Sequence, residues 1–188
     1  MDEKGIIKGI GNHDNPKVLI PKSDTAAFTT QPGNKEWASV IECIGINGHS
    51  LPAFVIFQGK GKRIQSSWID RSVDEKTIIQ VSPNGWTDRD IALRWIQHFD
   101  QYTRPQMRGK YRLLILDGHS SHISPEFVKF CTDNDIIALC LPPHATHEFE
   151  LQPLDVGIFS ALGEEYKKII SHRALFGTRY VDNSQFLL

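Results

Sequence analysis

One short segment constrains the fold more than any other part of this chain. Leu113-Leu114-Ile115-Leu116 is an unbroken apolar run, and Asp117 and Gly118 follow it directly. The run predicts a buried β-strand that ends at a carboxylate, because Gly118 favours a turn at that point. A rigid strand end beside an open turn is a place where enzymes hold metal-binding carboxylates. Asp117 is therefore the first candidate site residue.

Two further aspartates have comparably suggestive surroundings. Asp2 lies in Met1-Asp2-Glu3-Lys4-Gly5, and Asp155 lies in Leu151-Gln152-Pro153-Leu154-Asp155-Val156-Gly157, where it fits the acidic first turn of a helix. Taken alone, each of the three is also explained as a turn residue, a helix cap or a solvated terminal side chain. Taken together, they predict a site for phosphoryl transfer.

The chemistry of such a site explains the need for several carboxylates. Two divalent ions about 4 Å apart can activate a nucleophile and stabilise charge on the phosphate oxygens. Mg²⁺ and Mn²⁺ prefer hard oxygen ligands, so the protein would supply carboxylates and leave positions for water and substrate. Asp2, Asp117 and Asp155 are accordingly the predicted catalytic and metal-binding residues of a two-metal Mg²⁺ or Mn²⁺ site.

The order of the other segments predicts the fold class. Asn47-Gly48 separates two apolar runs, Trp37–Ile46 and Leu51–Gln58, which indicates a β-hairpin. Thr87 and Ser124 are expected to cap helices. We also expect a strand end with a turn at Gly5, strands at Val18–Ile20, Thr77–Val81, Tyr111–Leu116 and Ile136–Leu141, and a last helix from near Pro153 to about Arg173. Strands that alternate with helices after a hairpin predict an α/β mixed sheet flanked by helices.

Composition narrows the class of protein further. The chain has 188 residues, 40% of them apolar and 23% charged, which suits a single globular domain with a substantial core. A net charge of −1 disfavours a free-standing basic DNA-binding domain, but it is compatible with a nuclease core. Cys43, Cys131 and Cys140 form no C-x-x-C pair and are expected to be reduced and mostly buried. No apolar run approaches the roughly 20 residues of a membrane span, so no membrane partner is expected.

Basic residues offer weaker candidates for nucleic-acid contacts. Lys60, Lys62 and Arg63 lie in a glycine-containing loop that could follow a phosphate backbone without specifying sequence. The basic stretches at 104–112 and 167–173 are further candidates, although a solvated face explains each of them more readily than a DNA contact.

Four segments together resemble a known family. Residues 1–5, 116–122, 141–147 and 151–157 are similar, in this order, to motifs of the DDE transposase domain of the pogo/Fot/jerky group. This group lies within the mariner-like superfamily and includes the transposase-derived centromere protein B. The hairpin at 38–57 and the helix start at Gly85-Trp86-Thr87 resemble the same family.

The resemblance implies an RNase H-like fold and metal-dependent cleavage and joining of DNA strands. Asp2, Asp117 and Asp155 match the three catalytic carboxylates of the family. The implied partner is DNA, as transposon ends or target, in the nucleus, and a homodimer is compatible with it. Four histidines match recurring family positions, and zinc binding by them is disfavoured because a hard-oxygen site already accounts for the region: His119, His122, His144 and His147.

The chain also departs from the family pattern. The family's first strand begins several residues before its first Asp, whereas here one residue precedes Asp2. The spacing between His147 and Leu151 is longer than usual, and Gly163-Glu164-Glu165 stands where basic residues are common. We therefore expect residues 1–188 to be one catalytic domain, truncated at both ends and lacking an N-terminal helix-turn-helix region. The main alternative is an inactive relic that binds DNA or chromatin; an unrelated metal phosphohydrolase is disfavoured by the motifs.

Overall fold

The computed structural model describes residues 1–8, 36–61, 63–117, 124–141, 154–175 and 180–187. Four strands form one sheet in the order β1-β2-β3-β4: β1 (Asp2–Ile7), β2 (Trp37–Glu42), β3 (Phe54–Gln58) and β4 (Ile78–Ser82). The pairs β1–β2 and β2–β3 are antiparallel, and β3–β4 is parallel. The sheet is therefore mixed, as the sequence predicts.

A second, parallel pair adjoins this sheet. It consists of β5 (Arg112–Leu116) and β6 (Ile136–Cys140). The N-terminal amino group of Met1 donates a hydrogen bond to the carbonyl oxygen of Ile115, at 2.9 Å. The start of β1 therefore lies beside β5, and the two sheets meet at this point.

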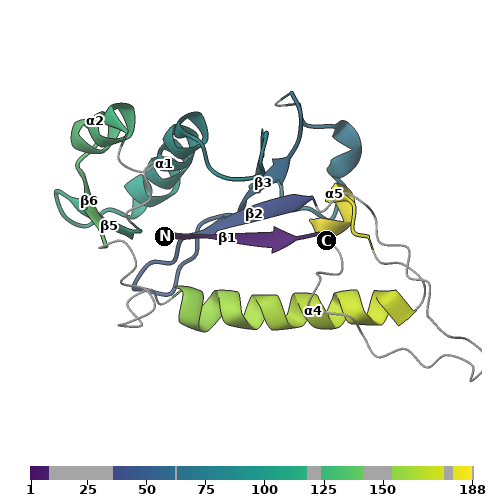
Figure 1. Cartoon of the computed structure of the whole chain (residues 1–188). Helices are drawn as coiled ribbons and strands as arrows, with labels where there is room; N and C mark the ends of the chain where they lie inside the picture. The colour runs from purple at the N-terminus through teal and green to yellow at the C-terminus, as the bar shows by residue number, and fades with distance from the viewer. Residues whose placement is uncertain (9–35, 62, 118–123, 142–153, 176–179, 188) are drawn as a thin grey trace, which may run out of the picture.

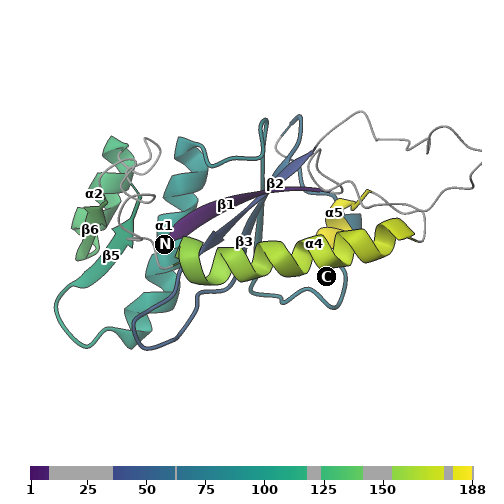
Figure 2. The ribbon, with the colours of Figure 1, turned by 60° about the horizontal axis from the view of Figure 1, so that its bottom comes forward.

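Helices cover both faces of the sheet. Helices α1 (Arg89–Thr103) and α2 (Pro125–Asp133) lie on one side, and α4 (Ser160–Leu175) runs along β1 on the other (Figures 1 and 2). A π-helical segment, η4 (Leu154–Phe159), leads directly into α4. The short elements are the 3-10 turns η1 (Ser66–Trp68) and η2 (Arg104–Gln106) and the helix α5 (Asn183–Phe186).

The main hydrophobic core lies between the sheet and α1 and α2. Large side chains of β3 and β5 pack there against Trp95 and Phe99 of α1 and Phe127 of α2. A smaller cluster on the opposite face contains Val55, Phe57 and Ile79. Side chains alternate between the two faces of the sheet along β1. Asp2, Lys4 and Ile6 therefore share one face, which is the α4 side.

Several sequence predictions are confirmed. The two strands β2 and β3 form the predicted antiparallel hairpin, and Gly48 has a φ of 80°, the left-handed value that the turn needs. Ser124 caps α2 by accepting a hydrogen bond from the Phe127 N–H, with Pro125 at the first position. The strand near Thr77–Val81 and the last helix are also present, whereas the predicted strand at Val18–Ile20 lies outside the described residues.

Other predictions are wrong for identifiable reasons. Gly5 lies inside β1 rather than in a turn, and a Cβ there would come within 2.3 Å of the Trp86 ring. The cap of α1 is Asp88, whose Oδ1 accepts from the Ile91 N–H, because Thr87 is buried and its own N–H donates to Glu3. Cys140 is exposed, although all three cysteines are free as predicted.

The strand that leads to Asp117 is buried on one face only. Leu114 and Leu116 belong to the main core, but Leu113 and Ile115 are 60% and 45% exposed. A continuous apolar run predicts burial on both faces. Here the described helices α1 and α2 cover one face, and the alternation of β5 is that of a half-buried strand.

Candidate metal-binding site

Asp2 is a buried carboxylate at the start of β1. Its side chain is 5% exposed, and Oδ1 accepts a hydrogen bond from the Glu3 N–H at 2.8 Å. The other oxygen, Oδ2, is buried without a hydrogen-bond partner among the described residues. Burial raises the pKa of Asp2 to about 6, and the negative charges of Asp155 and Asp117 add to this rise.

Asp117 lies at the end of β5 and is half-buried. The pKa of the Cys140 thiol is raised, first by partial loss of solvent around this largely exposed side chain and second by the charge of Asp117. The Leu141 N–H donates to the Leu116 carbonyl oxygen at 2.8 Å, so the pairing of β5 with β6 continues up to Asp117. Parallel strands bring their carboxyl ends to the same edge of a sheet, which is where Asp117 stands.

Asp155 comes from the α4 side of the sheet, from the segment that precedes α4. It is the second residue of η4, and its Oδ1 lies 3.1 Å from Nζ of Lys4. This ion pair connects η4 with β1. Since Lys4 follows Asp2 by two residues on the same face of the strand, the contact holds Asp155 on the face where Asp2 lies.

The fold thus brings the three predicted aspartates into one region. Met1 places the start of β1 beside Ile115, two residues before Asp117, and Lys4 holds Asp155. The pKa of Asp2 responds to both other carboxylates. Nevertheless, among the described residues no three His, Cys, Asp or Glu side chains stand close enough to hold a metal ion without rearrangement. The metal-binding and catalytic roles of these aspartates therefore remain predictions.

The donor set fits a hard divalent cation. A buried carboxylate oxygen without a partner is costly, and two further carboxylates nearby increase the cost by repulsion. Oxygen donors are those that Mg²⁺ and Mn²⁺ prefer. A divalent ion bound here would satisfy Asp2 Oδ2 and relieve the repulsion at once.

The basic loop lies away from this region. Lys60 and Arg63 are exposed and follow β3, whose last residues pair near the Ile7 end of the sheet. The five residue-to-residue steps from Asp2 to Ile7 span about 17 Å of strand, so these side chains begin far from the aspartates. Lys62 and the four histidines of the family motifs lie outside the described residues.

Sequence reasoning missed two charged residues of the site. Lys4 contacts Asp155, and the two-residue period of a strand would have placed it on the Asp2 face. Glu42 pairs directly with Asp2 across β1 and β2, and partial burial raises its pKa. Its position follows from the register of the sheet, which no local pattern in the sequence reveals.

Comparison with solved structures defines the class of fold. The Mos1 transposase paired-end complex with the left transposon end matches 99% of this chain and 48% of that chain, with a TM-score of 0.51 and 15% identity. A pre-cleavage Mos1 transpososome matches 99% and 49%, with a TM-score of 0.52 and 15% identity. The architecture is accordingly an RNase H-like mixed sheet flanked by helices, as predicted.

Sequence comparison then gives the family. The DDE superfamily endonuclease family matches residues 34–186, and the chain belongs to this family. The matched region contains Asp117 and Asp155 and begins after Asp2. The predicted resemblance to DDE endonucleases is confirmed, whereas membership of the pogo/Fot/jerky group stays a prediction.

A curated relative has a different description. The "MFS-type transporter clz9" of Cochliobolus lunatus is 38% identical over 157 residues, which are 84% of this chain and 17% of that protein. This chain therefore spans a small part of the relative's length, and about half of the Mos1 chains. Among the described helices, none is long and apolar enough to cross a membrane.

Proposed function

We propose that this chain is a DDE-type endonuclease or transposase core, which cleaves and joins DNA strands with divalent metal ions held by Asp2, Asp117 and Asp155. The observation that carries the proposal is the buried Asp2 carboxylate, which has an unpartnered oxygen and a pKa raised by burial and by the two other aspartates. Transposon ends or target DNA would be the substrate, and the nucleus the compartment. A homodimer is compatible with this role.

The three aspartates would have different roles in holding the metal ions. Bound Mg²⁺ or Mn²⁺ would supply an activated water and charge stabilisation at the phosphate. Asp2, the most buried of the three, would hold the metal from inside the fold through Oδ2. Asp117 and Asp155 are half-buried and would complete the site on the side open to DNA.

The second candidate function is a relic that binds DNA without cutting it. Two observations favour it: Lys4 already neutralises Asp155, and exposed Glu164 and Glu165 follow on α4. Acidic side chains here would weaken phosphate contacts beside the three aspartates, which counts against productive placement of a DNA strand for cleavage. This alternative differs from the first in catalysis, so an activity measurement separates the two.

Nicking of supercoiled plasmid in the presence of Mn²⁺ tests the proposal. We expect the wild-type chain to produce nicked circles and Asp117→Asn to produce none. Asp133→Asn is the matched control, because it removes a surface carboxylate whose ion pair is with exposed Lys129, on α2. Equal nicking by wild type and Asp117→Asn would remove Asp117 from the mechanism. A folded wild-type chain that retards DNA in a gel but does not nick it would favour the relic.

A further inference from the structure

Among the described residues, a lysine of β1 forms an ion pair with one of the candidate metal ligands. Nζ of Lys4 lies 3.1 Å from Oδ1 of Asp155 and 6.0 Å from the centroid of the Phe159 ring. Phe159 is 2% exposed, so its ring provides a fixed surface beside the ammonium group. Lys4 thereby bridges β1 and η4 on the face of the sheet where Asp2 lies.

The position of Lys4 conflicts with full metal coordination by Asp155. A carboxylate oxygen that accepts from an ammonium group at this distance has part of its coordination space occupied, and the positive charge repels an approaching cation. The Lys4 and Asp155 side chains are 47% and 39% exposed, and ion pairs this exposed contribute little to stability. A divalent ion can therefore compete with the ammonium group for Asp155.

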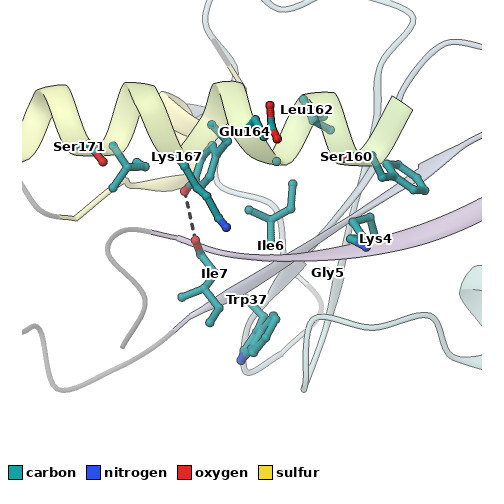
Figure 3. A pocket seen from close by; sticks show the side chains of 14 residues that line it. Lys4, Gly5, Ile6, Ile7, Trp37, Ser160, Leu162, Glu164, Lys167 and Ser171 are labelled. Carbon is teal, nitrogen blue, oxygen red and sulfur yellow. Dashed lines mark hydrogen bonds between the residues drawn. The ribbon is translucent and has the colours of Figure 1, made fainter. Parts of the chain in front are cut away.

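The structure provides space for Lys4 to move. A cavity of about 490 Å³ lies between β1 and α4, and Lys4 lines it together with Ile6, Glu164 and Lys167 (Figure 3). The lysine chain is long and flexible, so it can leave Asp155 without disturbing the backbone of β1. Glu164 is an exposed carboxylate on the wall of the same cavity.

We propose that Lys4 is a built-in counter-ion of the site: its ammonium group neutralises Asp155 in the metal-free protein and is displaced when a divalent ion binds. This inference rests on the proposed metal site. Lys4 then occupies one oxygen of Asp155 before metal arrives, and it lowers the affinity of the site for the ion.

Calorimetric titration with Mn²⁺ at pH 7.5 tests this displacement without relying on enzymatic activity. We expect Lys4→Met to bind Mn²⁺ with a Kd about three- to tenfold lower than the wild type, because a competing positive charge is gone. Lys4→Arg retains the charge and is expected to stay within about twofold of the wild type. Lys4→Gln provides a second neutral variant, and circular dichroism verifies that each variant is folded.

Two further variants make the test specific. Lys167→Met removes an equal charge from the wall of the same cavity, on exposed α4, and is expected to leave the Kd within about twofold. In an Asp155→Asn background, Lys4→Met should not lower the Kd for Mn²⁺, because the two residues would act through one contact.

The outcomes separate this inference from the proposed function. Tighter binding by Lys4→Met, or binding by Lys4→Met alone, supports the displacement. Wild-type binding with an unchanged or higher Kd in Lys4→Met overturns the displacement but leaves the metal site standing. Absence of Mn²⁺ binding in every variant overturns both.

Discussion

A single buried carboxylate explains much of the behaviour expected of this molecule. Asp2 is almost fully buried, one of its oxygens lacks a partner among the described residues, and burial raises its pKa to about 6. Folding a carboxylate into such a place costs free energy. Buried carboxylates of this kind occur at functional sites, where a bound ligand offsets the free-energy cost of burial.

Asp2 should make the stability of the metal-free protein depend on pH. The folded chain keeps the Asp2 proton up to about pH 6, whereas an unfolded chain releases it near 3.8. The folded state thus binds more protons between these values, and stability falls as pH rises through them. We expect Asp2→Asn to raise the free energy of unfolding at pH 7.5 by about 2 kcal/mol, and to leave it nearly unchanged at pH 3.5.

Urea denaturation in the presence of a chelator measures this difference. Asp133→Asn serves as the control, because Asp133 is a surface residue in an ion pair with Lys129. An equal gain for Asp2→Asn at both pH values would show that burial of the ionised Asp2 carboxylate is not the cause.

At the scale of elements, much of the fold follows from local chemistry. Asn47-Gly48 has the left-handed preference of a hairpin turn, and Ser124-Pro125 has the chemistry of a helix start, so both are predictable. Gly5 has the local signature of a turn, but its real partner is Trp86, which is distant in sequence. The exposure of one face of β5 is not predictable for a similar reason. An apolar run does not indicate which of its two faces a helix covers.

Arg112 is a charged residue whose burial the sequence does not predict. It lies in a basic stretch that the sequence indicates to be solvated, but its side chain is 7% exposed. Its guanidinium donates to Thr103 Oγ1 at 2.9 Å, to the Asn134 carbonyl oxygen at 2.7 Å and to the Asp100 carboxylate. One side chain thus joins the end of α1, the start of β5 and the end of α2.

We expect Arg112→Met to destabilise the protein by about 3 kcal/mol, because it removes the buried charge partner of Asp100 and the donor to Thr103 Oγ1 and the Asn134 carbonyl oxygen. Arg104→Met is the matched control. Arg104 contacts the same Asp100 carboxylate but is 54% exposed, so its loss should cost less than about 1 kcal/mol. Thermal unfolding of the two variants provides the comparison, and equal costs would contradict a structural role for burial of Arg112.

At the scale of the whole molecule, the site depends on topology. The sequence contains the three aspartates and their motifs, but not the contacts that bring them together. The hydrogen bond from Met1 to Ile115, the Lys4–Asp155 pair and the opposition of Asp2 to Glu42 all arise from register and packing between distant segments. The identity of the candidate residues is predictable, whereas Lys4 and Glu42 emerge only from the fold.

If Asp2, Asp117 and Asp155 form one metal site, Mn²⁺ should shift the thermal unfolding of the protein through all three carboxylates. An ion that binds only the folded state stabilises it by RT ln(1 + [L]/Kd), about 2.7 kcal/mol at one hundred times Kd. We therefore expect millimolar Mn²⁺ to raise the Tm of the wild type by several degrees. Asp2→Asn, Asp117→Asn and Asp155→Asn should each lose most of this shift while remaining folded, and Asp133→Asn should keep it. A full shift in any of the three variants would contradict a site shared by these carboxylates.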